Sequence, residues 1–400
     1  MLRADVDPRA LDQAGWAVVF AKETDSQVRE AMAPLLSWRR EQAGKLYQEI
    51  EVLPGEGARG FLKRQGIAPG IADPEHLPFY TLLIGSPETL PFEFQYEISN
   101  SRAVGRLYFR TPEEYAVYAE TLVASESSDR SAAESKKAYF IAPSHENDPA
   151  SQLKLKHLIR PLVSRLAKAL PDGSVDLLAG GRAGKAAIVN ALTEMKAGFV
   201  FGAAHGYRLP AGHPEQEIYQ GAWVCQDWPG PPEAVDRAHV LTREDLPSAV
   251  QSQVLLLLGA DSAGTPKWDQ FDSENPFTDR RSVARRPFVN DLAMHLLSRG
   301  ALAVIGHVDR SWTTTFLQAD GEPFQQNVIE DIVRQLLKGW PVGLAMRSMA
   351  ERSMQLLFQF YETLRSADSS DALEIGQLWV AGIDARNYII LGDPAARIQT

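Results

Sequence analysis

Two short segments of the sequence contain residue types that could do covalent chemistry. His205 and Gly206 close the apolar run "AGFVFGAAHG" (197–206), and "VLLLLGADSAGTP" (254–266) ends in a tight turn with Ala260 at its apex. A histidine at a strand end can transfer a proton, and a glycine beside it lets a backbone N–H approach a ligand closely. Strand-to-loop turns of this kind expose a reactive side chain in several hydrolase folds, yet this apex is alanine. Taken alone, His205 is equally well explained by a structural hydrogen bond.

Buried strands must position these two turns. Continuous apolar runs alternate with helix-like segments, which predicts an α/β fold with a mainly parallel sheet flanked by helices. The carboxyl ends of such strands share one edge of the sheet, where ligands bind. The predicted strands of the second part of the chain are "AYFIAP" (138–143), "VDLLAG" (175–180), 197–206, "SQVLLLLGA" (252–260) and "GALAVIGHV" (300–308).

A polar stretch divides the chain into two predicted parts. Residues 125–137, "SESSDRSAAESKK", contain no apolar periodicity and are typical of a linker. We therefore expect an amino-terminal α/β lobe over 1–130 and a second lobe over 131–400. The first lobe is expected to hold the strands "WAVVFA" (16–21), "YTLLIG" (80–85) and "AVGRLYF" (103–109), with a helical stretch over 27–50.

Composition excludes several classes of function. The formal charge of −10 argues against nucleic acid as a partner, and no apolar run is long enough to span a membrane. The amino terminus has no apolar segment like a signal peptide, so we expect a cytoplasmic protein. A single cysteine, Cys225, rules out an internal disulfide framework and a thiolate metal cluster. We expect no cofactor, because "AGGRAGKAA" (179–187) departs from a phosphate-binding loop, and no metal, because His205 and His213 have no third ligand nearby.

The order and spacing of these motifs resemble a known family. The interval from His205 to Ala260 is 260 − 205 = 55 residues, close to the separation of about 50 between the catalytic histidine and cysteine of caspases. The chain resembles caspase-like cysteine peptidases of the CHAT branch, with similarity to gingipain-like enzymes. In that branch a strand-end His-Gly precedes a Cys-acid-Ser/Thr-small motif, which "ADSAG" matches except for Ala260 in place of the cysteine. The segments "FVNDLAMHLLSRGALAVIGHVDRSW" (288–312) and "NYIILGDPAARI" (387–398) resemble the family's later elements, and 80–123 resembles its non-catalytic lobe.

The resemblance implies a cysteine endopeptidase that cleaves a dedicated protein partner in bacterial signalling or defence, a gasdermin-like protein being one class of substrate. His205 would then be the base for a cysteine at position 260, and the N–H groups of Gly206 and residue 260 would bind the oxyanion. Ala260 has two explanations: an engineered change that stops turnover, or a natural loss that leaves a peptide-binding module. A hydrolase acting through Asp261 is a third hypothesis.

Further acidic and aromatic residues are candidates for substrate binding. Glu146 and Asp148 lie in the loop "PSHENDPAS" and could receive an Arg or Lys side chain, although Asp148 before Pro149 is also a good helix start. Asp261 could add negative charge to the specificity pocket. Asp309 and Trp312 could line the same cleft or could be solvated loop residues.

Activation is expected to need a partner, a ligand or self-cleavage. Segments 125–137 and "TDRRSVARRP" (278–287) are candidate processing sites, and the second is as well explained by an ordinary surface loop. Cys225 is predicted to be a packed, inert thiol. The apolar stripes of the helices near 323–338 and 342–365 are predicted to belong to the core.

Overall fold

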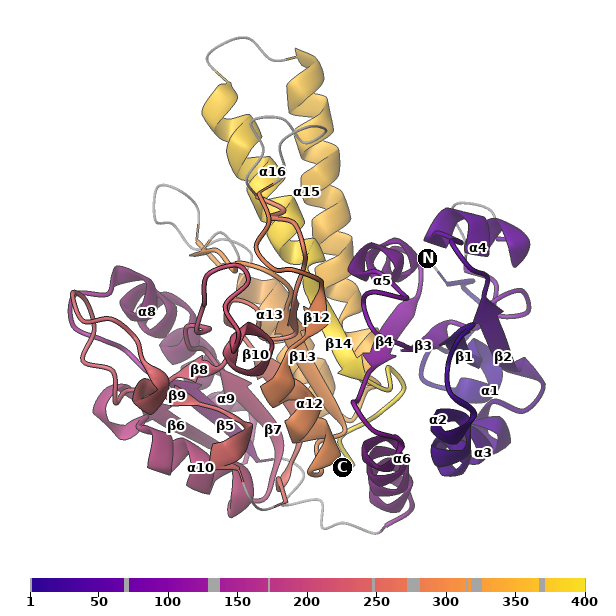
Figure 1. Cartoon of the computed structure of the whole chain (residues 1–400), viewed down its shortest axis with the longest axis horizontal. Helices are drawn as coiled ribbons and strands as arrows, with labels where there is room; N and C mark the ends of the chain where they lie inside the picture. The colour runs from indigo at the N-terminus through magenta and orange to yellow at the C-terminus, as the bar shows by residue number, and fades with distance from the viewer. Residues whose placement is uncertain are drawn as a thin grey trace.

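A computed structural model describes residues 2–67, 72–128, 137–171, 173–246, 249–271, 281–313, 316–317, 326–366 and 371–399. One large twisted sheet runs through the middle of the molecule (Figure 1). Helices cover it, and a long helical hairpin projects away from the strands.

The sheet contains ten strands in the described part of the chain. Its order is β2 (Tyr47–Val52), β1 (Trp16–Ala21), β3 (Tyr80–Ile84), β4 (Ala103–Leu107), β14 (Tyr388–Gly392), β13 (Ala303–His307), β10 (Ser252–Leu257), β7 (Ala197–Gly202), β5 (Ala138–Ala142) and β6 (Val175–Ala179). The predicted α/β class with a mainly parallel sheet is therefore confirmed.

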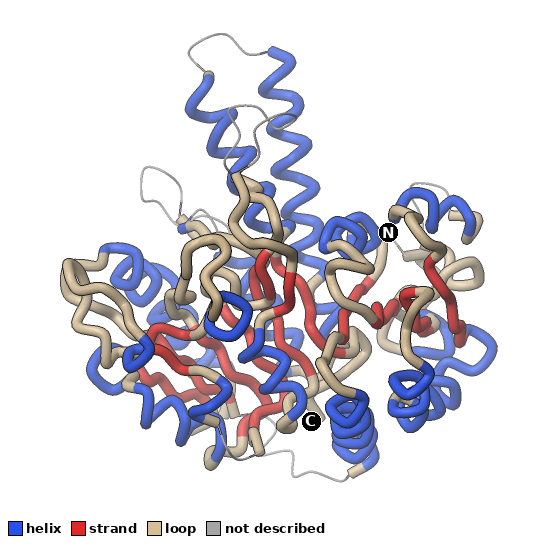
Figure 2. Tube along the Cα trace, in the orientation of Figure 1, coloured by secondary structure: helices blue, strands red, loops and turns tan. Residues whose placement is uncertain are grey.

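Strand direction divides the sheet into two parallel blocks. β2, β1, β3, β4 and β14 run parallel to one another, and so do β13, β10, β7, β5 and β6. The blocks meet at β13 and β14, which pair antiparallel over Ala303–His307 and Tyr388–Gly392. Figure 2 shows the strands of both blocks side by side.

The expected boundary near residue 130 lies outside the described residues, so the division into two lobes stays a prediction.

Helices cover both faces of the sheet because both faces are apolar. Along β10, Leu255 and Leu257 belong to one buried cluster, and Val254 and Leu256 belong to another. This alternation is the two-residue period of a strand buried on both sides. The helices of the first part are α1 (Leu11–Ala14), α2 (Ser26–Ala31), α3 (Ala33–Ala43), α4 (Ala58–Arg64), α5 (Phe92–Ser99) and α6 (Pro112–Ser127).

The helices of the second part connect its strands and flank them. They are α8 (Pro149–Leu153), α9 (Arg160–Ala169), α10 (Lys185–Thr193), α11 (Gln216–Tyr219), α12 (Asp291–Ser298), α13 (Gln326–Leu337), α14 (Val342–Ala345), α15 (Arg347–Ser366) and α16 (Ala372–Arg386). A π-helical segment, Lys154–Ile159, joins α8 to α9. Short 3-10 helices span Gly44–Leu46, Gly180–Arg182, Arg237–His239 and Arg243–Asp245. Two small antiparallel sheets have two strands each: β8 (Trp223–Val224) pairs with β9 (Val240–Leu241), and β11 (Gly264–Thr265) pairs with β12 (Phe288–Val289).

Two expectations about individual elements need correction. The helical stretch expected over 27–50 ends earlier, because β2 begins at Tyr47 as the outermost strand beside β1. Its sequence "YQEIEV" carries two glutamates, which suit a solvated sheet edge better than a buried strand. The apolar stripe of α13 is buried as predicted, but α15 exposes Met354, Phe358, Tyr361 and Leu364 on the projecting hairpin that it forms with α16 (Figure 1).

A buried polar network ties the first helices to the last turn of the chain. Arg39 of α3 is 1% exposed, and its Nε lies 2.7 Å from Oδ2 of Asp393, while its Nη1 lies 2.7 Å from Oε2 of Glu126. Trp16 Nε1 donates to the other oxygen of Asp393 at 2.9 Å. The turn "GDP" therefore holds the amino-terminal helices and β14 together.

No described helix is long and apolar enough to cross a membrane.

Candidate active site

The ends of β7 and β10 bring His205 and Ala260 together. The two strands pair in parallel, with Leu257 beside Gly202, so the residues that follow them leave the sheet at the same edge. A Cβ atom on Gly206 would lie 1.8 Å from the carbonyl oxygen of Ala260, so only glycine allows this approach. The structure therefore brings together the two strand ends that the sequence singled out, and their role as one catalytic site stays a prediction.

Asp148 completes a charged pair with His205. Its Oδ2 atom lies 2.6 Å from Nε2 of His205, across the loop that follows β5, and its side chain is 11% exposed. Burial alone raises the pKa of Asp148, but the hydrogen bond and charge of His205, with hydrogen bonds from Ser151, hold it well below the ordinary value. The carboxylate therefore stays ionised and holds the imidazole by its Nε2 atom. Nδ1 is the ring nitrogen that Asp148 does not contact.

This contact corrects the expected role of Asp148. The residue does precede a helix, α8, as one of the two predictions stated. Its carboxylate is already engaged by His205, so it is not free to receive a substrate side chain as the other prediction proposed. Glu146, two residues earlier, is exposed in the same loop.

Aromatic and basic side chains surround the His205–Asp148 pair. The rings of His205 and Trp228 meet edge to face with centroids 6.4 Å apart, and the rings of His145 and Trp228 are tilted with centroids 4.7 Å apart. Lys154, in the π-helical segment, donates from Nζ to the carbonyl oxygen of Ala204 at 3.1 Å. Burial lowers the pKa of Lys154 to about 8. None of these three neighbours was predicted: His145 shares the loop of Asp148, and Trp228 and Lys154 come from segments with no motif of their own.

The backbone at the site is strained. Asn147, Asp261 and Asp309 have φ angles of 62°, 56° and 70°, and within the described ranges they are the residues other than glycine with positive φ. Such conformations cost about 1–3 kcal/mol each and collect at functional sites. Asp261 N donates to Asp309 O at 2.8 Å, so the turn after β10 and the turn after β13 support each other.

The carboxylates of Asp261 and Asp309 are held by Arg208. Arg208 Nε lies 3.0 Å from Oδ2 of Asp261, and its Nη2 lies 3.3 Å from Oδ1 of Asp309. Both aspartates are fully buried. Burial raises the pKa of Asp261 to about 6, although the charge of Arg208 acts in the opposite direction. The expectation that these two side chains line the substrate cleft directly therefore needs correction, since both face Arg208 and the protein interior.

Two other nucleophiles are excluded by their surroundings. Ser262 is 1% exposed, and its hydroxyl bonds the carbonyl oxygens of Leu257 and Gly259 and accepts from His307 N at 2.9 Å, so it is engaged within the protein. Cys225 is buried in the core, and burial raises the pKa of its thiol to about 12. A thiol of this kind is unreactive near neutral pH.

Two backbone N–H groups remain available at the turn. Among the hydrogen bonds of the described residues, neither Gly206 N nor Ala260 N donates to another group. The neighbouring bonds from Tyr207 N to Ala222 O and from Val224 N to His205 O fix the Gly206 strand end. An oxyanion that formed at residue 260 would thus find two unpaired donors.

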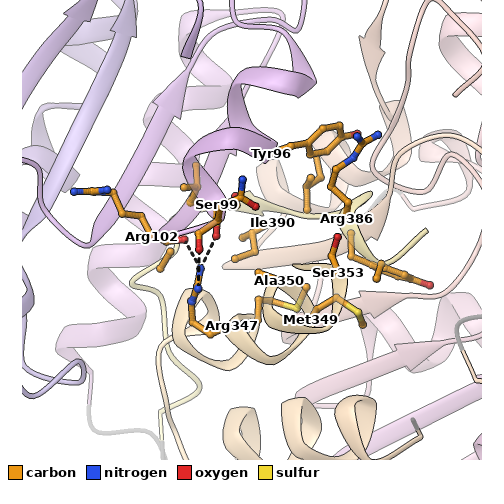
Figure 3. A pocket seen from close by; sticks show the side chains of 17 residues that line it. Tyr96, Ser99, Arg102, Arg347, Met349, Ala350, Ser353, Arg386 and Ile390 are labelled. Carbon is orange, nitrogen blue, oxygen red and sulfur yellow. Dashed lines mark hydrogen bonds between the residues drawn. The ribbon is translucent and has the colours of Figure 1, made fainter. Parts of the chain in front are cut away.

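Two cavities lie away from His205 and Ala260 and differ in size and in the residues that line them. A cavity of about 40 Å³ lies between α5 and β4 on one side and α15 and β14 on the other, where Arg347 donates to carbonyl oxygens at the end of α5 (Figure 3). It is too small for a peptide. A cleft of about 730 Å³ is lined by residues within 87–93, 266–270, 285–287 and 379–386, and neither His205 nor Ala260 is among them.

Trp312 lies in an aromatic group beyond the end of β13. Its ring meets that of Phe271 at 5.6 Å and the guanidinium of Arg310 at 5.5 Å, and 38% of the residue is exposed. The described contacts place it with α16, where Trp312 N donates to Asp384 Oδ1 at 2.8 Å. Within the described ranges no cluster of three His, Cys, Asp or Glu residues could hold a metal ion.

Comparison with solved structures identifies the fold. The chain superposes on the Arg-specific cysteine proteinase gingipain R with a TM-score of 0.56 and 13% identity, covering 97% of this chain and 79% of that one. It superposes equally on the complex of the RgpB pro- and mature domains of Porphyromonas gingivalis (TM-score 0.56, 12% identity, 96% and 81% covered). Neither a protein-family model nor a curated protein sequence matches. The chain therefore has the caspase-like α/β fold that gingipain R displays.

Proposed function

We propose that this chain is built as a cysteine endopeptidase in which residue 260 occupies the place of the nucleophile. The observation that carries this proposal is the His205–Asp148 hydrogen bond of 2.6 Å beside the turn of Ala260. A base that is oriented by a buried carboxylate and stands next to a strained turn is the arrangement that activates a nucleophile in acyl transfer. The fold shared with gingipain R supports the same reaction class.

A cysteine at position 260 would complete the reaction. Its thiolate attacks the peptide carbonyl carbon, after giving its proton to His205, and the carbonyl oxygen becomes an oxyanion that the N–H groups of Gly206 and residue 260 stabilise. Collapse of this intermediate breaks the C–N bond, and His205 returns the proton to the leaving amine. Water then attacks the thioester with His205 as base, which releases the acid and the thiol. Asp148 stabilises the imidazolium in both halves of the cycle.

The chain with Ala260 lacks only the sulfur. It retains the base, its carboxylate partner and both N–H donors, so it should bind peptides without cutting them. This property is shared by an inactivated peptidase and by a natural peptide-binding module. A hydrolase that uses Asp261 finds no support, because this carboxylate is buried and bonded to Arg208 and Thr265.

The finer features of the proposal concern context. We infer that the substrate is a dedicated protein partner in the cytoplasm of a bacterium, for which a gasdermin-like protein is one candidate. The setting would be signalling or defence, and a second partner would activate the peptidase. Of the two candidate processing segments, residues 129–136 and 278–280 lie outside the described residues. The described part of the second segment pairs with the chain after β11, since Val283 N donates to Lys267 O and Asp269 N donates to Arg281 O, each at 2.9 Å.

The test is the Ala260→Cys variant, compared with the unaltered chain on a peptide library scanned at the residue before the cleaved bond. We expect cleavage only with the cysteine, and its loss when His205→Ala is added. Cys225→Ala in the same background is the matched control for a stray thiol and should change nothing. Cleavage by the unaltered chain, or cleavage that survives His205→Ala, would refute the proposal.

A further inference from the structure

Arg208 reaches from the loop after His205 to two carboxylates at neighbouring strand ends. It contacts Asp261, directly after residue 260, and Asp309, two residues beyond the end of β13. The two carboxylates are fully buried, whereas 28% of the Arg208 side chain is exposed. The guanidinium is therefore the part of this charged cluster that reaches the surface.

The two carboxylates lie beneath the edge of the sheet at which His205 and residue 260 also lie. β7, β10 and β13 are adjacent and parallel, so His205, Asp261 and Asp309 all lie at one edge of the sheet. Ligands of open parallel sheets bind in the crevice outside this edge. Two carboxylates open to such a crevice would attract the ammonium or guanidinium group of a substrate, but here Arg208 lies over them.

In this chain the oxygen atoms of both carboxylates already accept hydrogen bonds from the protein. Asp261 accepts from Thr265 Oγ1 at 2.9 Å and from Gln220 Nε2 at 3.3 Å, in addition to Arg208. Asp309 accepts from the backbone N–H groups of Gln270 at 3.1 Å and of Arg310 at 2.7 Å. A lysine or arginine from a substrate would have to displace Arg208 from an enclosed site.

Removal of Arg208 would leave two like charges close together. The two aspartates are linked through the hydrogen bond from Asp261 N to Asp309 O, and both have left-handed backbone conformations. The charge of Asp309 adds to the effect of burial in raising the pKa of Asp261, and Arg208 opposes both. Arg208 thus acts as an internal cation that balances the pair.

We propose that Arg208 is the specificity-determining residue of the subsite beside residue 260, where its guanidinium takes the place of a basic substrate side chain, so that the subsite selects uncharged side chains and rejects lysine and arginine. This inference rests on the proposed function only in that peptides bind at this edge of the sheet. It does not require that they are cut.

Binding to the unaltered chain tests the inference without turnover. Fluorescent peptide sublibraries, each with one residue fixed as Leu, Gln, Glu, Lys or Arg, are titrated with the unaltered chain, Arg208→Lys and Arg208→Gln, and anisotropy is measured. We expect the Leu and Gln sublibraries to bind at least tenfold more tightly than the Arg sublibrary. Arg208→Lys should keep this order, and Arg208→Gln should reverse it. If Arg208→Gln does not fold, Arg208→Gln with Asp261→Asn removes one of the two buried charges and should show the same reversal.

The outcomes separate this inference from the proposed function. Tight binding of Lys or Arg sublibraries by the unaltered chain, equal binding of all sublibraries, or no binding of any would overturn the role of Arg208. An Ala260→Cys variant that never cuts, together with the expected binding order, would overturn the peptidase proposal and leave the role of Arg208 intact.

Discussion

Replacing Asp148 by asparagine in the Ala260→Cys variant is the sharpest test of the catalytic pair. The side chain keeps its volume and its place before α8, but it loses its charge and can present an amide N–H to His205. The hydrogen bond of 2.6 Å between Oδ2 and Nε2 is replaced by a neutral and less well-matched contact. The imidazole is then free to turn or to adopt the wrong tautomer.

The size of the effect follows from the contact. A hydrogen bond to a charged group contributes about 1.5–3 kcal/mol, which corresponds to about 10- to 150-fold in rate. Loss of the correct tautomer adds to this, and the same substitution in a Ser-His-Asp protease lowers kcat by about 10⁴. We therefore expect kcat to fall by about 10² to 10⁴, with KM nearly unchanged, because Asp148 faces His205 and not the substrate.

Steady-state kinetics on the best library peptide measures kcat and KM separately. Asp148→Ala is the matched comparison and should lose a similar factor, and thermal unfolding of each variant checks that the fold is kept. A kcat above one tenth of the parent value would refute the reasoning. A change confined to KM would instead assign Asp148 to substrate binding, which is one of the two roles that the sequence predicted.

Three further predictions concern the framework of the site. Gly206→Ala should abolish cleavage by Ala260→Cys in the same assay, because the added Cβ would lie 1.8 Å from the carbonyl oxygen of residue 260; full activity would contradict the geometry. Arg39→Met should lower the free energy of unfolding in urea by about 3–5 kcal/mol, since it leaves buried carboxylates without their partner, and a loss under 1 kcal/mol would show that the network is not buried as described. Asp261 has a higher pKa in the folded chain, about 6, than the ordinary value of 3.8, so the folded state holds its proton more tightly and stability should fall as pH rises from about 4 to about 6, by at most about 3 kcal/mol. Asp261→Asn should flatten this part of the urea-measured stability curve, and an unchanged slope would exclude the assignment.

The strands that carry the site were predictable because they are buried on both faces. β7, β10 and β13 are continuous apolar runs bounded by glycine, and this signal does not depend on distant contacts. The polar edge strand β2 was missed for the converse reason: all but one of its residues are exposed or half-buried, so its sequence resembles a helix as much as a strand. The exposed stripe of α15 was assigned to the core because periodicity alone cannot tell which apolar face has a partner.

The sequence by itself determined the α/β class, the two strand-end turns and the absence of sulfur at residue 260, because these depend on local composition and on order along the chain. Only the tertiary structure decided what the acidic residues do. Asp148 was one of several acids available to a substrate until folding placed it on His205, 57 residues away in sequence. Asp261 and Asp309 were expected in the cleft until folding turned both toward Arg208. A carboxylate has no intrinsic preference between these partners, and its role is fixed by which cation the packing of distant segments brings within hydrogen-bond distance.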